Sequence, residues 1–411
     1  MKLLRTLSRF LVGFVFIYSG FVKGIDPLGS TYKFTEYFLA AHLDFLSSLS
    51  LALAIILSAA ELLIGMALIL RLRMRIAAWA VLCFMSFFTL LTFVSAILNP
   101  VSDCGCFGDA IKLTNWQTFF KNIVLMVFVI IIFISRKEYK VKYKVVGEWV
   151  FLGIILSGFL LIIRFCYFHL PIIDFLPYKT GTNIMKSMEI PPGAPLDEYN
   201  TLLYYEKDGV VKEFTLDNYP WQDSSWRHVE TKSIRVKQGY VPPIHDFSIS
   251  SPDGADITAE VLADPGFSVL MVSHNLLKAD REGLYKANKM AEMCASGKCR
   301  FYALTASSAT DAATLGDTLI HYPFYHTDET TLKTMIRSNP GFIFLKEGTI
   351  IGKWSYKDMP DPDKTKDGFL SYVFQYYRHI REQLTNIALW LTLALTIAII
   401  KIVKLNFDRR I

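Results

Sequence analysis

Residues 76–108 read IAAWAVLCFMSFFTLLTFVSAILNPVSDCGCFG, in which an uncharged run from 76 to 102 leads directly into a loop with two cysteines. A helix needs about 20 apolar residues to cross a bilayer core, so residues 76–98 are long enough to span a membrane. Only 19% of the 411 residues are charged, against roughly a quarter in average soluble chains. Comparable apolar blocks lie at 10–22 (extended to about Leu3), 51–70, 117–135, 149–163 and 384–400. The pattern predicts six spans.

Basic residues gather on one side of these spans. Lys and Arg in short loops stay on the cytoplasmic side of a membrane. With six spans the basic clusters share a side, which places both termini in the cytoplasm and explains the net charge of +6 without a nucleic-acid partner. The clusters are Lys2, Arg5 and Arg9; Arg71, Arg73 and Arg75; Arg136, Lys137, Lys140, Lys142 and Lys144; and Lys401, Lys404, Arg409 and Arg410.

Residues 171–383 read as ordinary soluble protein between the fifth and sixth spans. The topology therefore places them outside the cytoplasm, as the large periplasmic region of a protein in the bacterial inner membrane. Two alternating strands around Asp208-Gly209 predict a hairpin. Strands at 267–274 and 300–307 flank a helix at 281–294, and a second hairpin covers 340–354, which together predict an α/β sheet.

Cys104 and Cys106 lie outside the cytoplasm in this topology, where disulfides can persist. Gly105 between them permits the tight turn that a Cys-Gly-Cys ring would need. Strained, exposed disulfides are the labile or catalytic ones. Three interpretations stay open: a catalytic redox pair, a structural disulfide or unpaired thiols, and half of a metal site. No metal site is predicted, because no clear Cys or His pair completes four ligands.

Three motifs carry a resemblance to a known family. They are SRFLVGFVFIYSGFVKGIDP (8–27), SAAELLIGMALIL (58–70) and CGCFG (104–108). Residues 1–140 resemble the DoxX-like superfamily of four-helix membrane proteins, and in particular its MauE (methylamine utilisation protein MauE) branch, where a paired-cysteine CGCFG follows the third helix. The resemblance implies oxidative thiol chemistry beside a thioredoxin-like partner. The methylamine substrate need not carry over.

Three polar residues within the predicted spans are further site candidates: Glu61, Arg9 and Lys23. Glu61 lies near the centre of the second span, where an unpaired charge costs several kcal/mol. Either Arg9 pairs with Glu61, or burial keeps Glu61 protonated and able to exchange a proton with a quinone. A membrane quinone is therefore the candidate cofactor.

Residues 243–355 resemble the thioredoxin fold, nearer its TlpA and peroxiredoxin members. IHDFSISSPDGADITAEVL (244–262) is similar to their opening hairpin, and SNPGFIFL (338–345) is similar to the segment whose proline, here Pro340, is in the cis form in that family. Where that family carries CxxC, this chain has SHNLLKADRE (273–282). The resemblance therefore implies a degenerate domain without dithiol chemistry of its own.

Cys294 and Cys299 enclose a short Gly-containing connection. Such a connection brings two cysteines near disulfide range, and a structural disulfide is the expected role. A resolving role for Cys104 and Cys106, or two reduced bystanders, are the alternatives.

The predicted fold class is a multi-span α-helical membrane protein, a four-helix DoxX-like bundle plus two further spans, with an extracytoplasmic α/β thioredoxin-like domain. The predicted units are the bundle at 1–140, a fifth span at 145–170, a β-rich insertion at 171–242, the thioredoxin-like domain at 243–370 and a last span at 384–405.

The predicted function is a thiol-disulfide relay through Cys104 and Cys106. Electrons would pass from an extracytoplasmic thiol-containing or thioredoxin-like partner to the membrane. The neighbouring Asp103 and Asp109 are expected to raise the pKa of both thiols, which favours a disulfide-form oxidant. The alternative is a non-catalytic, membrane-anchored scaffold or assembly protein whose outer domain binds a client.

Overall fold

The computed structural model describes residues 2–101, 103–139, 145–237, 239–315 and 320–359. Within these residues, five helices are long and apolar enough to cross a membrane. The first five predicted spans are therefore confirmed as helices of a membrane protein. The sixth, 384–405, and residues 360–370 of the predicted outer domain lie outside the described residues. The five helices are α1 (Lys2–Ile25), α3 (Ser50–Leu70), α4 (Met74–Leu98), α5 (Asn115–Ile134) and α6 (Val145–Phe168).

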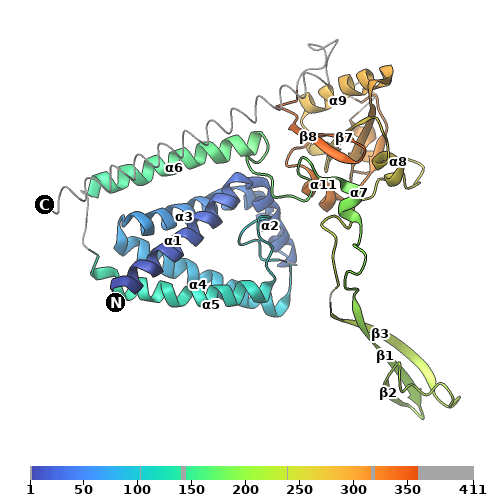
Figure 1. The fold of residues 1–411 in the computed structure, drawn as a ribbon, viewed down its shortest axis with the longest axis horizontal. Coiled ribbons are helices and arrows are strands. Elements are labelled where there is room, and N and C mark those ends of the chain that lie inside the picture. Colours follow the sequence, from blue (N-terminus) through green and yellow to red (C-terminus); the bar gives the residue numbers. More distant parts are fainter. Residues whose placement is uncertain (1, 102, 140–144, 238, 316–319, 360–411) are drawn as a thin grey trace.

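Successive spans run in opposite directions, which gives the bundle two distinct ends (Figure 1). One end holds the start of α1 and the residues after α5, where Arg5 contacts Glu138. The other end holds the last turns of α1 and the α4–α5 loop with Cys104 and Cys106. We call it the cysteine end.

Glycines bring α1 and α3 into close contact. A Cβ atom added to Gly20 would lie 2.6 Å from the backbone of Leu62 and Ser58, and one added to Gly65 would lie 2.7 Å from the Gly13 carbonyl oxygen. Small residues of this kind let helix backbones approach each other in membranes, where the lipid tails supply no hydrophobic drive for helix association. This approach sets Glu61 on α3 opposite the half of α1 that lies at the cysteine end.

The connection between the first two spans is mostly helical. Helix α2 (Pro27–Ala40) and the 3₁₀-helix η1 (Asp44–Leu49) cross the cysteine end between α1 and α3. The Asp26 carboxylate accepts a hydrogen bond from the Gly29 amide at 2.9 Å, and Pro27 occupies the first turn, which are both favourable at a helix start. Periodicity did not reveal α2 because its polar and aromatic residues form no continuous apolar stripe.

A five-stranded mixed sheet forms the core of the α/β domain, in the order β6-β5-β4-β7-β8. Strands β4, β5 and β6 are parallel, and β7 and β8 are antiparallel to their neighbours. Both faces of the sheet bury apolar side chains, with Leu270 and Ile343 on one face and Met271 and Phe342 on the other. The predicted strand–helix–strand unit and second hairpin are confirmed.

The bounds in this domain are β4 (Phe267–Ser273), β5 (Arg300–Thr305), β6 (Phe324–His326), β7 (Gly341–Lys346), β8 (Thr349–Ser355), α8 (Thr258–Leu262), η3 (Leu276–Lys278), α9 (Arg281–Met293), the π-helical turn η4 (Cys294–Lys298), α10 (Ala309–Thr314) and α11 (Glu329–Met335). The connection between α6 and β1 holds α7 (Ile184–Met188), and the 3₁₀-helix η2 (Ser135–Lys137) follows α5.

A three-stranded antiparallel arm, ordered β2-β1-β3, projects away from both the bundle and the α/β domain (Figure 1). Its strands are β1 (Glu198–Lys207), β2 (Val210–Thr215) and β3 (Arg227–Lys237). Asp208 and Gly209 both have positive φ, the conformation that a two-residue type I′ hairpin requires. The hairpin predicted at these residues is confirmed.

Candidate functional site

The loop between α4 and α5 folds back onto the end of α1. Gly105 and Gly108 have φ angles of 63° and 51°, in the left-handed region that glycine adopts without a steric penalty, and the Gly108 amide donates to the Gly105 carbonyl at 3.1 Å. The Asn115 side chain at the start of α5 donates to the Val101 carbonyl at 2.8 Å. These contacts place Cys104 and Cys106 above the last turns of α1.

The sulfur atoms of Cys104 and Cys106 lie 3.5 Å apart, as two thiols within hydrogen-bonding distance. Both side chains are partly exposed. The other free thiols of the described residues, Cys83 and Cys166, lie within α4 and α6. Cys104 and Cys106 are therefore positioned to act together.

The two thiols differ in acidity. The pKa of Cys106 is lowered, first because Cys104 can donate a hydrogen bond to its thiolate and further because Lys121 and Lys23 are positively charged. The pKa of Cys104 is raised, by the same hydrogen bond and by burial. The expectation that both thiols would have raised pKa values is wrong for Cys106.

Partners of Asp103 and Asp109 explain this correction. The carboxylate of Asp103 lies 3.2 Å from the Lys33 ammonium, and that of Asp109 lies 2.6 Å from the guanidinium of Arg337. Each negative charge is offset by its own cation, so neither carboxylate governs the acidity of Cys106. Lys33 belongs to α2, and Arg337 belongs to the distant α/β domain.

Glu61 is ion-paired with Lys23, and the predicted pairing with Arg9 is wrong. The Lys23 ammonium donates to the two Glu61 oxygens at 2.7 and 2.9 Å. Arg9 lies 14 residues earlier on α1, about 21 Å away along a helix, and donates instead to the carbonyl oxygens of Leu68 and Ile69 at the end of α3. Lys23 is the nearer cation because it lies at the cysteine end, on the turns of α1 that face Glu61.

Ser19 connects this ion pair to the cysteine loop. Its hydroxyl oxygen lies 2.8 Å from a Glu61 carboxylate oxygen and 2.8 Å from the Cys106 carbonyl oxygen, and it accepts from Lys23 at 3.0 Å. Because a hydroxyl carries one proton, Ser19 can donate to only one of these acceptors at a time. A buried network of charge and hydrogen bonds thus extends from Cys106 into the bundle.

The α/β domain contacts the cysteine end of the bundle through Arg337. This side chain is 5% exposed and donates from Nε to both Asp26 oxygens at 3.0 and 2.9 Å. Its Nη2 donates to Asp109. The sequence did not identify Arg337, because its partners lie 311 and 228 residues away in the chain.

The end of β4 faces the same region. His274 packs edge-on against Tyr32 of α2, with ring centroids 6.0 Å apart. Ser273 donates to the Asn339 side chain at 2.7 Å, and Asn339 donates to the Asn275 carbonyl at 2.8 Å. The peptide bond between Asn339 and Pro340 is cis. The segment that holds Pro340 therefore lies beside the start of residues 273–282, which contain no cysteine.

Burial lowers the pKa of His274 to about 4, and the positive charges of Lys333 and Lys278 act in the same direction, against Glu329. An unfolded histidine near its ordinary pKa of 6.5 binds a proton more readily than this site does. The contribution of neutral His274 to the free energy of unfolding is therefore fully present above pH 6.5. It is lost as the pH falls towards 4, by on the order of 3 kcal/mol.

We expect His274→Gln to flatten this dependence when unfolding midpoints are measured from pH 7.5 to 4.5. His245→Gln, which changes an exposed histidine of the same domain, is the control and should leave the slope unchanged. Parallel plots of unfolding midpoint against pH for the unmutated chain and His274→Gln would show that His274 does not cause this pH dependence.

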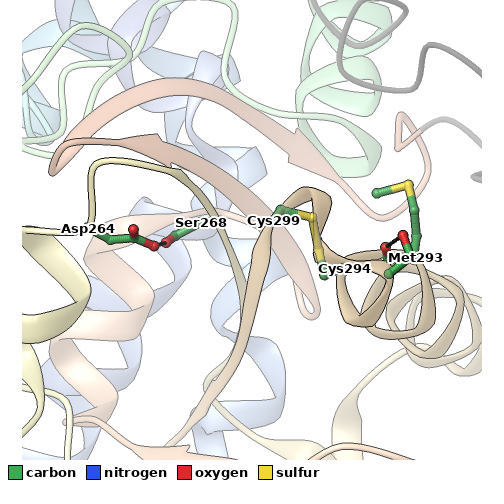
Figure 2. Close-up of a disulfide and its surroundings, with 6 residues drawn as sticks. Asp264, Ser268, Met293, Cys294 and Cys299 are labelled. Carbon is green, nitrogen blue, oxygen red and sulfur yellow. Dashed lines mark hydrogen bonds between the residues drawn. A yellow bond between two sulfur atoms is a disulfide. The ribbon is translucent and has the colours of Figure 1, made fainter.

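Cys294 and Cys299 form a disulfide that joins the end of α9 to the start of β5 (Figure 2). The hydrogen bond from Ser268 to Asp264, drawn in the same view, marks the end of the sheet where β4 begins. Because β4 and β5 are parallel, His274 lies at the opposite end, about 20 Å along the strands. The structure does not bring this disulfide together with Cys104 and Cys106.

Among the residues that the structure describes, no group of three or more His, Cys, Asp or Glu residues could hold a metal ion. The features assembled here define a helical membrane protein with a paired-cysteine loop and a second, α/β domain seated on its cysteine end.

Comparison with protein families assigns the membrane part more closely. Residues 1–135 match the family described as Methylamine utilisation protein MauE, and residues 199–238, the β arm, match a Domain of unknown function (DUF8463). The chain thus has a MauE-family membrane region followed by an α/β domain. No curated protein and no solved structure matches the chain.

Proposed function

We propose that this protein relays electrons between a partner dithiol and the membrane through Cys104 and Cys106. The observation that carries the proposal is the pairing of the two sulfur atoms, 3.5 Å apart with opposite shifts in acidity, above the buried Lys23–Glu61 pair. The match of residues 1–135 to the MauE family supports it, because the CGCFG loop lies within the matched region.

The proposed orientation places the cysteine end outside the cytoplasm. Arg5, Arg71, Arg73, Arg136 and Lys137 all lie at the opposite end of the bundle, and basic residues of short loops remain cytoplasmic. The α/β domain, which is seated on the cysteine end, is then periplasmic. Thiol exchange with secreted or envelope proteins requires this orientation.

The exchange begins with the Cys104–Cys106 disulfide. A partner thiolate attacks the sulfur of Cys104, the bond between the two sulfurs breaks, and Cys106 leaves as a thiolate. A thiol of lower pKa is the better leaving group, which favours Cys106 in this role. The second partner thiol then displaces Cys104, so that the partner is oxidised to a disulfide and the Cys104–Cys106 pair is reduced.

Reoxidation of the pair needs an acceptor of two electrons and two protons, and a membrane quinone supplies that chemistry. The residues around Cys106 are compatible with binding of a quinone ring. Tyr18 is 40% exposed on α1, its ring lies 5.6 Å from that of Phe107, and the Lys121 ammonium lies over Phe107. Ser19 and Glu61 can hold or pass a proton beside Cys106.

The α/β domain is proposed to be thioredoxin-like. Its parallel β6-β5-β4 and antiparallel β7-β8 strands, the helix α9 after β4 and the cis-proline before β7 support this assignment. Residues 273–282 contain no cysteine, so the domain would recognise or dock and would not exchange thiols at that position.

The relay predicts catalysis by the purified protein. We expect reduced dithiothreitol and a short-chain quinone to react faster in its presence than alone, with the gain followed by quinone absorbance. Cys104→Ser/Cys106→Ser should abolish the gain, and Cys83→Ser, which removes a thiol within α4, should retain it. Equal rates with and without the unmutated protein would contradict the relay.

The second candidate function is a non-catalytic scaffold, which the thiol-free end of β4 favours. In that case the Cys104→Ser/Cys106→Ser chain would match the unmutated chain in every activity. The quinone assay therefore separates the two functions.

A further inference from the structure

Helix α2 lies between the α/β domain and the sulfur pair. On one side, Tyr32 contacts His274 and lies under the side chains of Lys333 and Arg337. On the other side, Lys33 reaches Asp103 in the cysteine loop. The domain and the cysteines are thus connected through one helix of fourteen residues.

The contact on the domain side is built around a buried charge. The guanidinium of Arg337 joins Asp26, which caps the start of α2, to Asp109, which ends the cysteine turn. An arginine bound by two carboxylates is oriented by several charge-assisted hydrogen bonds. If the domain moves away from the bundle, the buried Arg337 charge loses both carboxylates together, so the contact should open as a unit.

Gly29 on α2 makes room for this contact. A Cβ atom added there would lie 2.8 Å from the Nη2 atom of Arg337 and closer still to the Asp26 carboxylate. Real Cβ atoms do not approach other atoms so closely, so a larger residue at position 29 requires the ends of the Asp26 and Arg337 side chains to move apart from it.

The contact on the cysteine side covers Cys104. A Cβ atom added to Gly105 would lie 3.2 Å from the Cγ atom of Lys33, so the stem of Lys33 passes directly over the Cys-Gly-Cys turn. The Lys33 ammonium also lies 3.2 Å from the carboxylate of Asp103, the residue next to Cys104. Movement of α2 away from the loop would therefore uncover the Cys104 side of the turn.

We propose that the α/β domain is a built-in docking partner of the membrane region. Its seating through Arg337 on Asp26 and Asp109 holds α2 over Cys104 and limits the access of other proteins to the sulfur pair. Only the identity of those proteins, as thiol-exchange partners, rests on the proposed function. The domain of this chain therefore acts as a gate over the cysteine end.

The test uses the full chain in lipid nanodiscs after reduction, in a Cys83→Ser/Cys166→Ser background. Two quantities are measured: the rate at which a polyethylene-glycol maleimide modifies Cys104, assigned by peptide mass, and hydrogen exchange of the α2 amides. Arg337→Ala removes the buried cation. Gly29→Ala disturbs the Asp26–Arg337 contact without a change of charge. Arg300→Ala, an exposed arginine of the same domain, is the matched control.

Both docking variants should increase the rate of Cys104 modification by about tenfold or more and should speed exchange in α2, while Arg300→Ala changes neither. Alanine by itself favours a helix, but the added methyl group also meets the Asp26 carboxylate that caps α2, so Gly29→Ala is read together with Arg337→Ala, which leaves that cap in place. Faster exchange with an unchanged modification rate would overturn the gate. Unchanged exchange in both variants would overturn docking through Arg337. Neither result depends on electron transfer, so the relay is tested separately.

Discussion

Cys106→Ser accumulates a covalent mixed disulfide through Cys104, and Cys104→Ser accumulates at least about tenfold less. This is the result that we expect when membranes from living cells are quenched with acid and an alkylating reagent. In this variant Cys104 is a free thiol, so its thiolate attacks the disulfide of an oxidised partner, one partner sulfur leaves as a thiolate, and Cys104 stays linked to the other. Cys104 is the sulfur that exchanges with the partner in the proposed order, and without Cys106 no thiol of this chain displaces the partner from it.

The adduct is detected as a reductant-sensitive band of higher mass, and peptide mass spectrometry assigns the linked cysteine. The unmutated chain should show little adduct, because Cys106 displaces the partner. Cys166→Ser, which removes a buried thiol of α6, controls for general loss of a cysteine. Adducts through Cys106 alone would reverse the proposed order of attack, and adducts in neither variant would exclude exchange through this loop.

The second prediction concerns the buried ion pair. Lys23→Met or Glu61→Leu alone should destabilise the bundle by about 3–5 kcal/mol, because each leaves a charge without its partner at a site where both side chains are 8% exposed. The double variant Lys23→Met/Glu61→Leu should recover most of this loss, since an apolar pair of similar volume needs no compensation. Thermal unfolding in detergent measures the three effects.

The double variant also separates structure from chemistry. It should remain folded, and alkylation of Cys106 at neutral pH should slow only slightly, because Lys23, which favours the Cys106 thiolate, and Glu61, which opposes it, are removed together. Lys207→Met/Asp223→Leu removes an exposed ion pair of the β arm and should change stability by less than about 1 kcal/mol. Additive losses in Lys23→Met/Glu61→Leu would show that the two residues do not stabilise each other.

Local patterns in the sequence were sufficient for most elements. The apolar blocks predicted α1, α3, α4, α5 and α6, and Asp208-Gly209 predicted the hairpin of the β arm. Helix α2 was missed, because its short, mixed sequence lacks the period on which such predictions depend.

The candidate site was predicted only in part. The sequence identified Cys104, Cys106, Glu61 and Lys23 as candidates. Of its two alternatives for Glu61, pairing with Arg9 or protonation, the structure excludes the first because Glu61 pairs with Lys23. The sequence also assigned the same direction of pKa change to two thiols that the structure distinguishes. The error for the thiols came from proximity along the chain, because Asp103 and Asp109 neighbour the cysteines but pair with Lys33 and Arg337 in space.

By itself, the sequence determined that this is a membrane protein with two cysteines in a tight loop and an α/β region behind its fifth helix. These properties follow from hydrophobic length, from glycine and from the alternation of strands and helices, all of which act between near neighbours. Only the tertiary structure decided that Lys23 meets Glu61, 38 residues away, and that Arg337 meets Asp26, 311 residues away. Charge interactions act through space, and the folded chain alone sets those distances.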